Sequence, residues 1–348
     1  MNIIYVNSNK TRKQFKQFRI DLYKNDPYYV STIEFTCDML LYKETEFCKK
    51  CDIVPIMVCD NKILCEAFLV KNPCDNFVQI SFFEALENQN EAVELLISEA
   101  KKFALTHKCN KIIIGMNGHL SYGLGFSVDM KNPNTFDSTY TKLYYNDYFK
   151  SYLKHELVAF SNNIDNVLNN SLSKRGSIEI RPIDLKNFKE EMEIFRNLCD
   201  ETIGKTFLYS KTSNNHFYDL IKDMLFFLKP ENILFAYKDK TPIGFVFWHP
   251  DYNEILSKGK HNSLLSIAIK YILNKNKIKK MKINAIGVLD KYQGIGTISL
   301  LDEVSNYVEK FETVETNFVW CNNLKSMKLN NHLIGKIERR FAIYEVSI

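Results

Sequence analysis

A short glycine-rich segment, Gln293-Gly294-Ile295-Gly296-Thr297, has the residue types of an anion-binding loop. An apolar run typical of a strand precedes it at 281–288, and residues at helical spacing follow it at 296–311. The first N–H groups of a helix have no intrahelical acceptor and carry a partial positive charge, and glycine lets the backbone come close to a ligand. A strand, a glycine loop and a helix therefore predict a site for a phosphate or pyrophosphate.

The spacing of the glycines separates three kinds of phosphate-binding loop. A dinucleotide-binding fold needs G-x-G-x-x-G and a P-loop needs a Lys after its last glycine, and neither pattern is present. Through Gln293 and Gly296 the segment is similar to the acyl-CoA-binding loop of the GNAT N-acyltransferase superfamily, although Ile298 stands where a small residue is expected. A strand–helix turn that binds no ligand would also explain the two glycines.

Composition and charge limit the class of protein. The chain has 348 residues, 25% of them charged, and a net charge of +5, which by itself calls for neither nucleic acid nor a membrane surface. The N-terminus turns polar after six residues, so we expect a cytoplasmic protein without a membrane partner. The nine cysteines have no repeating spacing, and the Cys48–Cys51 pair has no second C-x-x-C, so we expect free thiols and no metal.

The elements that must position the loop recur in the same order in the two halves of the chain. The pattern predicts, in the first half, elements at 3–6, 10–24, 53–60, 63–71, 76–84, 91–107, 111–115 and 144–155. In the second half it predicts elements at 178–182, 188–199, 216–227, 233–237, 243–248, 264–272, 281–288, 296–311, 315–321, 324–334 and 339–346. We therefore expect two tandem α/β domains with mixed sheets, at 1–163 and 178–348, joined by a polar linker at 164–177.

This order matches a GNAT domain, and the chain resembles a bacterial family of tandem GNAT-like proteins. The matching segments are 22–30, 82–84 and 144–149 in the first half, and 250–253, 287–288, 292–294 and 340–344 in the second. The resemblance implies a sheet whose central strands diverge after the fourth strand. It also implies that the pantetheine arm of acyl-CoA lies in the gap, bound to strand backbone as an added strand would be.

The resemblance further implies N-acyl transfer, from acetyl-CoA or a longer acyl-CoA bound in the C-terminal domain, to a small-molecule or peptide amine. It places the thioester against the backbone of Ile286 and Val288, where an N–H group polarises the carbonyl. It implies that Asn323 contacts pantetheine. The pyrophosphate would be held by Gln293, Gly294, Ile295, Gly296, Thr297 and Ile298. The first half has no such loop after its strand at 111–115, so we expect it not to bind CoA in this way.

Acyl transfer also requires a base for the amine and an acid for the leaving thiolate. His249 and Asp251 end a strand of the second half and are our candidates for the base, since histidine titrates near neutrality. A turn would explain the same segment, because Asp and Asn bond their own backbone. The helix at 324–334 has no Tyr to act as the acid, which leaves Tyr344 or Tyr292.

Two other hypotheses remain open. A non-catalytic acyl-CoA-binding or scaffolding protein is favoured by Ile298 and by the missing Tyr. An aminoacyl transferase that uses charged tRNA would need a basic groove, which the modest net charge does not support. The lysine-rich run at 275–282 predicts a solvated turn, or a segment that attracts the CoA phosphates or an acidic substrate.

Overall fold

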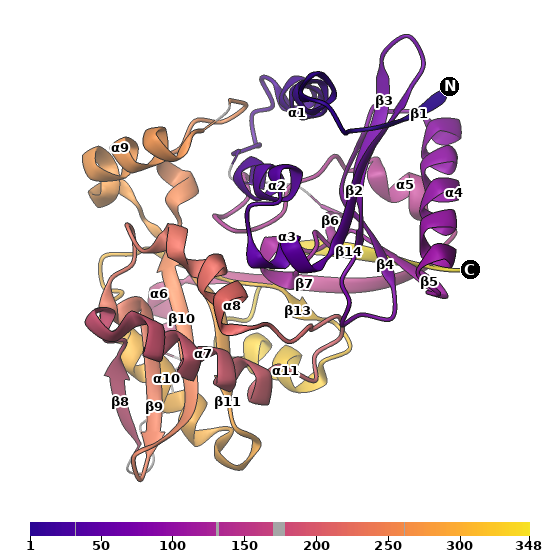
Figure 1. Cartoon of the computed structure of the whole chain (residues 1–348). Coiled ribbons are helices and arrows are strands. Elements are labelled where there is room, and N and C mark those ends of the chain that lie inside the picture. The colour runs from indigo at the N-terminus through magenta and orange to yellow at the C-terminus, as the bar shows by residue number, and fades with distance from the viewer. Residues whose placement is uncertain (32, 130–131, 170–177, 261) are drawn as a thin grey trace. The chain divides into compact units, whose positions relative to one another are not determined.

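The computed structural model describes residues 1–31, 33–129, 132–169, 178–260 and 262–348, which form two compact units (Figure 1). The first unit comprises Met1–Leu157, Leu256–Ile267 and Arg339–Ile348. The second comprises Val158–Ile255 and Ala268–Glu338. Each unit contains a mixed sheet flanked by helices, which confirms the α/β class.

The sheet of the first unit has the strand order β1-β2-β3-β4-β5-β14, and only β4 and β5 are parallel neighbours. Its strands are β1 (Asn2–Tyr5), β2 (Asp52–Cys59), β3 (Ile63–Lys71), β4 (Val78–Ala85), β5 (Lys111–Ile114) and β14 (Ile337–Ser347), with the short β6 (Phe126–Ser127) beside β14. Its helices are α1 (Asn9–Tyr23), α2 (Ile33–Tyr42), α3 (Glu46–Lys50), α4 (Asn90–Thr106) and α5 (Tyr145–Phe149). Phe68 packs on Phe15 of α1, whereas Ala67 and Leu69 belong to the core under α4, so the two helices cover opposite faces.

The sheet of the second unit has the strand order β7-β12-β11-β10-β9-β8, and only β11 and β12 are parallel neighbours. Its strands are β7 (Leu153–Asn163), β8 (Glu179–Pro182), β9 (Ile233–Lys238), β10 (Thr241–Pro250), β11 (Lys280–Val288) and β12 (Thr313–Thr316), with the short β13 (Val319–Trp320) beside β7. Its helices are α6 (Ile164–Asn169), α7 (Phe188–Thr202), α8 (Asn214–Ile221), α9 (Leu264–Asn274), which begins in the first unit, α10 (Ile295–Ser305) and α11 (Leu324–Leu333). Gly287 contacts α7 and its neighbour Val288 contacts α10, so these helices cover opposite faces.

The last strand of each sheet comes from an unexpected part of the chain. From Arg339 onward β14 belongs to the first unit, where Tyr344 pairs with Ile114 of β5. From Val158 onward β7 belongs to the second unit, where Asn163 pairs with Thr313 of β12. The structure therefore divides the chain differently from the expected boundaries at 1–163 and 178–348.

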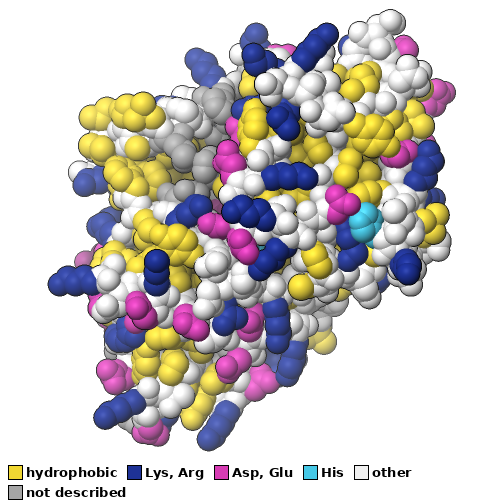
Figure 2. Space-filling model, viewed as in Figure 1, with side chains coloured by type: hydrophobic (Ala, Val, Ile, Leu, Met, Phe, Trp, Pro, Cys, Tyr) yellow, Lys and Arg dark blue, Asp and Glu magenta, His cyan; other side chains and the backbone are white. Residues whose placement is uncertain are grey.

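Other elements also differ from the sequence analysis. The helix expected at 144–155 is only α5, and β7 begins at Leu153, while 170–177 of the expected linker lie outside the described residues. Helix α9 leaves apolar side chains on its surface, and Ile272 and Leu273 are 60% and 73% exposed. Figure 2 shows that positively and negatively charged side chains are mixed over the visible face. No helix of the described residues combines the length and hydropathy needed to cross a bilayer.

Candidate functional site

Strand β11 has one edge that is only partly paired. It pairs with β10 along its length, but its register with β12 runs only from Lys280 to Ile283. The N–H group of Asn317 donates to the carbonyl of Ile283 at 2.8 Å and is the last bond of this pairing. Among the described residues, no strand pairs with the remainder of β11 on this side, which confirms the expected divergence of the central strands.

A bulge determines which backbone groups face that open edge. Trp248 pairs with Ile283 and Phe247 pairs with Ala285, so Asn284 is an extra residue in β11. Beyond the bulge, Leu289 donates its N–H to the carbonyl of Ile243, toward β10, at 2.8 Å.

Because backbone direction alternates along a strand, the polar groups of Ile286 and Val288 point away from β10. These are the two residues expected to contact the thioester. The bulge thus turns an N–H group of each toward the open edge of β11.

The glycine loop forms the N-terminus of α10. Gly294 is the N-cap, with φ of 88°, and a side chain there would meet nothing within 4 Å. It supplies no side-chain cap, and the first helical bond runs from Ile298 N–H to Gly294 O at 2.9 Å. The N–H groups of Ile295, Gly296 and Thr297 therefore precede any intrahelical bonding, as an anion site requires.

Gly296 has a different function in the same turn. A Cβ atom at this position would lie 2.8 Å from Cγ1 of Val288, a stiff and buried side chain of β11. Gly296 thus lets α10 approach β11, while Gly294 supplies the exposed turn. The Gln293 side chain donates to Asp290 at 2.7 Å and holds the loop before the helix.

Asn317 is a site residue that the sequence analysis missed. Its Oδ1 atom is enclosed and has no hydrogen-bond partner among the described residues, although it stands where β11 and β12 separate. Asn323, which we had expected there, lies beyond β13 and uses its side chain to cap α11, accepting from Ser326 N–H at 3.1 Å. An asparagine directly after a short parallel strand was the available signal.

The segment after α7 also approaches the diverging strands. A Cβ atom on Gly287 of β11 would lie 2.2 Å from Oγ1 of Thr202, the last residue of α7. Five residues later, the ring of Phe207 packs edge-on against Trp320 of β13 at 5.2 Å. This segment therefore contacts β11 at one end and β13 at the other, which makes Trp320 a fluorescent reporter for the site.

His249 and Asp251 lie farther along the sheet and are enclosed. His249 pairs with Lys282, four residues before Ile286, which is roughly 13 Å along the strand. The ring is fully buried and stacks on Tyr252, and burial, followed by the charge of Lys282, lowers the pKa of His249 to about 3. The expectation that it titrates near neutrality is therefore wrong. Asp251 is 3% exposed and accepts from Asn253 N–H at 3.2 Å, as in the turn interpretation.

The buried imidazole predicts a pH dependence of stability. Unfolded histidine binds a proton below about pH 6.5, whereas folded His249 stays neutral down to about pH 3, so stability is lost as the pH falls between these values. We expect the free energy of unfolding to fall between pH 7.5 and 5.5 by about 1.4 kcal/mol more in the wild type than in His249→Gln, as measured by urea unfolding. His332→Gln, at an exposed position, should keep the wild-type difference. An unchanged pH dependence in His249→Gln would contradict this account.

The two candidate acids, Tyr344 and Tyr292, belong to different units. Tyr344 is in β14 and belongs to the first unit, not to the unit that holds the glycine loop. Its hydroxyl group donates to Oδ1 of Asn146 at 2.9 Å, and burial raises the pKa of Tyr344 to about 12. Tyr292 ends a 3₁₀ turn before the loop, and its ring lies under the amino group of Lys291 at 5.4 Å.

The first unit has the same divergence of strands, but its own side chains fill it. Strand β4 pairs with β5 only as far as Ile80, and a bulge follows at Phe82, whose φ is 50°. The N–H of Phe82 donates to Asn117 at 2.7 Å, and its carbonyl accepts from Arg19 at 2.8 Å.

Two tyrosines around the start of α5 occupy the next stretch of this edge. The hydroxyl of Tyr145 accepts from Ala85 N–H at 3.1 Å, and the hydroxyl of Tyr144 donates to Ala85 O at 2.7 Å. The backbone groups that are open in β11 are thus bonded in β4.

Comparisons with known proteins agree with this geometry. The sequence matches no protein-family model and no curated protein. Three solved structures share the fold: a tandem GNAT protein from the clavulanic acid biosynthesis pathway (7% identity, TM-score 0.57, 99% of this chain and 98% of that one), a GCN5-related N-acetyltransferase from Sphaerobacter thermophilus (10%, 0.56, 99% and 95%) and a conserved protein of unknown function from Enterococcus faecalis V583 (9%, 0.55, 100% and 72%). The chain therefore has the tandem GNAT-like fold.

Proposed function

We propose that the protein is a GNAT-type N-acyltransferase that binds acetyl-CoA or a longer acyl-CoA in its second unit. The observation that carries this proposal is the open edge of β11, which leads directly to the uncapped N-terminus of α10. An extended pantetheine arm can bond the strand edge, and the pyrophosphate can accept from the first N–H groups of the helix. In this proposal the enclosed Oδ1 of Asn317, a residue at the point where β11 and β12 separate, accepts a hydrogen bond from a pantetheine amide.

The residues around the open edge have separate roles in this reaction. Acyl-CoA supplies the activated thioester. The amine nitrogen forms the new amide bond as the thiolate leaves with the electron pair of the C–S bond, and the proton lost by the nitrogen converts the thiolate to the free CoA thiol. The N–H of Ile286 or Val288 polarises the carbonyl, because a fixed backbone donor stabilises the developing oxyanion. Gln293, Gly294, Ile295, Gly296, Thr297 and Ile298 form the pyrophosphate loop.

The enclosed polar residues of β10 have structural roles in this proposal. His249 is a weak base with a pKa of about 3, and Asp251 shapes the turn that follows the strand. The acceptor, a small-molecule or peptide amine, therefore enters the reaction as the neutral amine. The first unit serves as a scaffold, because Asn117, Tyr144 and Tyr145 already bond the edge of β4.

A non-catalytic acyl-CoA-binding protein is the second candidate. It is favoured by the location of Tyr344, because that hydroxyl group belongs to the first unit and is bound to Asn146. Ile298 in the pyrophosphate loop favours the same alternative, since it is larger than the residue expected at this position. The two candidates agree on binding and differ in turnover.

Binding and turnover can be measured separately. Fluorescence reports binding, because the chain has only two tryptophans and each can be kept as the single reporter. In Trp248→Phe the remaining tryptophan is Trp320, beside the diverging strands, and we expect saturable quenching by acetyl-CoA or a longer acyl-CoA. Release of free CoA thiol in the presence of a panel of primary amines would support the enzyme. Binding without thiol release on any amine would favour the second candidate, and the absence of binding by any CoA species would contradict both.

A further inference from the structure

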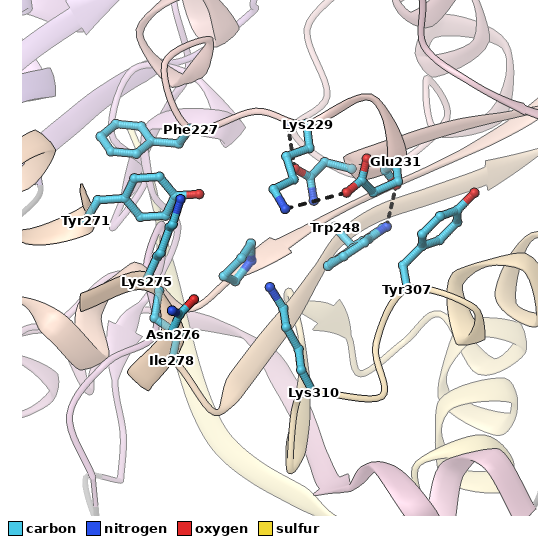
Figure 3. A pocket seen from close by; sticks show the side chains of 12 residues that line it. Phe227, Lys229, Glu231, Trp248, Tyr271, Lys275, Asn276, Ile278, Tyr307 and Lys310 are labelled. Carbon is cyan, nitrogen blue, oxygen red and sulfur yellow. Dashed lines mark hydrogen bonds and ion pairs between the residues drawn. The ribbon is translucent and has the colours of Figure 1, made fainter. Parts of the chain in front are cut away.

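A cavity lies in the second unit, at the end of the sheet opposite the glycine loop. Its volume is about 280 Å³, and Trp248 and Pro250 of β10 line it (Figure 3). Pro250 pairs with Met281 near the start of β11, whereas the glycine loop follows Val288. These two positions are roughly 20–25 Å apart along the strand. The cavity is therefore distinct from the loop assigned to the pyrophosphate.

Three lysines from different elements line this cavity. Lys229 precedes the 3₁₀ turn before β9, Lys275 follows α9, and Lys310 follows α10. Figure 3 shows that the ends of their side chains approach the same space. Glu231 also lines the cavity, with its carboxylate 3.9 Å from Nζ of Lys229, while Lys275 and Lys310 form no ion pair with any residue that the structure describes. The ionised side chains thus leave a net charge of +2.

The three ammonium groups disfavour one another. Burial lowers the pKa of Lys310, the charges of Lys229 and Lys275 lower it further, and Glu231 offsets only part of this. The surrounding sequence adds to the positive potential, since residues 255–289 contain eight lysines and no acidic residue. An anion in the cavity would relieve this repulsion.

Aromatic rings form another part of the lining. The indole N–H of Trp248 donates to Glu231 O at 2.7 Å, which fixes the ring. Tyr271 packs edge-on against Phe227 at 5.2 Å, and Tyr307 also contributes to the wall. Fixed rings beside positive groups suit a ligand that combines a flat ring with an anion.

We propose that this cavity binds a small phosphate monoester that carries one aromatic ring. The dianion of a phosphate monoester matches the net charge of the lining, and lysine is a frequent ligand of phosphate. The volume is just below the usual lower range for ligand pockets, which favours a single ring over a larger body.

Trp248 provides a direct test with phenyl phosphate as the probe. In Trp320→Phe it is the remaining tryptophan, and we expect saturable quenching by phenyl phosphate, with much weaker binding of phenol and of inorganic phosphate. In this background Lys310→Gln should weaken binding about tenfold or more, because a charged partner of the phosphate is lost. Lys325→Gln makes the same change of charge at an exposed position of α11 and should leave the affinity unchanged.

Two further variants keep the test decisive. If Lys310→Gln does not fold, Lys275→Gln, at an exposed position, replaces it with the same expected loss. Ile295→Asp, in the glycine loop, should leave the binding of phenyl phosphate intact. Equal affinity for phenyl phosphate in Trp320→Phe alone and in Trp320→Phe with the lysine substitutions, or loss of binding in Ile295→Asp, would overturn the proposal. Because Trp320 reports separately on CoA, the failure of one proposal leaves the other testable.

Discussion

Replacing Ile295 by aspartate is expected to weaken the binding of acetyl-CoA by roughly 100-fold, and to lower the melting temperature less than replacement by asparagine does. Ile295 is the first residue of α10, next to the N-cap Gly294. A carboxylate in the first turn of a helix interacts favourably with the helix dipole, so it should support the fold. The same carboxylate would repel a pyrophosphate bound to the N–H groups of this turn.

The negative charge should stabilise the helix but weaken the binding of acetyl-CoA, and these opposite effects make the variant informative. Asparagine has nearly the same shape as aspartate but carries no charge. Ile295→Asn therefore loses the same apolar contact as Ile295→Asp and should bind acetyl-CoA far better. Binding is measured by Trp320 fluorescence in the Trp248→Phe background, and stability by thermal unfolding. Equal affinity of the two variants would show that no phosphate lies at this turn.

Local signals predicted the parts of the site that are continuous in sequence. The strand at 281–288, the glycine turn and the start of α10 follow one another, so periodicity and glycine chemistry were enough to locate them. The backbone roles of Ile286 and Val288 were expected from a family pattern. The structure adds the reason for their direction, which is the bulge at Asn284.

Contacts between distant segments could not be predicted in this way. The apolar run at Leu157–Phe160 is compatible with either sheet, and only the tertiary pairing of the following residues, Ser161–Asn163, with β12 assigns β7 to the second unit. The last strand was correctly predicted as a strand, but its partner is β5, so Tyr344 moved to the first unit. His249 has an ordinary pKa in a peptide, and the shift arises from burial that sequence does not encode locally.

Arg19→Met is expected to destabilise the protein by about 3–5 kcal/mol, the largest effect on stability that we predict. The guanidinium group of Arg19 lies 2.7 Å from the carboxylate of Glu84, and their side chains are only 5% and 2% exposed. Glu84 also accepts hydrogen bonds from the hydroxyl groups of Tyr23 at 2.8 Å and Tyr145 at 2.5 Å. Loss of the arginine would leave a buried carboxylate without its positive partner.

A second ion pair on the same helix, between Lys16 and Asp38, provides the control. Lys16 of α1 lies 2.6 Å from Asp38, but these side chains are about one-third exposed, so Lys16→Met should cost less than about 1 kcal/mol. In Arg19→Met/Glu84→Gln the buried charge is removed together with its partner, so the double variant should be more stable than Arg19→Met alone. Urea unfolding measures all three.

Equal losses in Arg19→Met and Lys16→Met would show that burial adds nothing to the Arg19–Glu84 pair. The expected difference has a structural consequence, because Arg19 also donates to Phe82 O at the bulge of β4 and Tyr145 also accepts from Ala85 N–H. The same network thus neutralises Glu84 and fills the divergence of strands in the first unit. Its disruption should loosen the edge of β4 that corresponds to the open edge of β11 in the second unit.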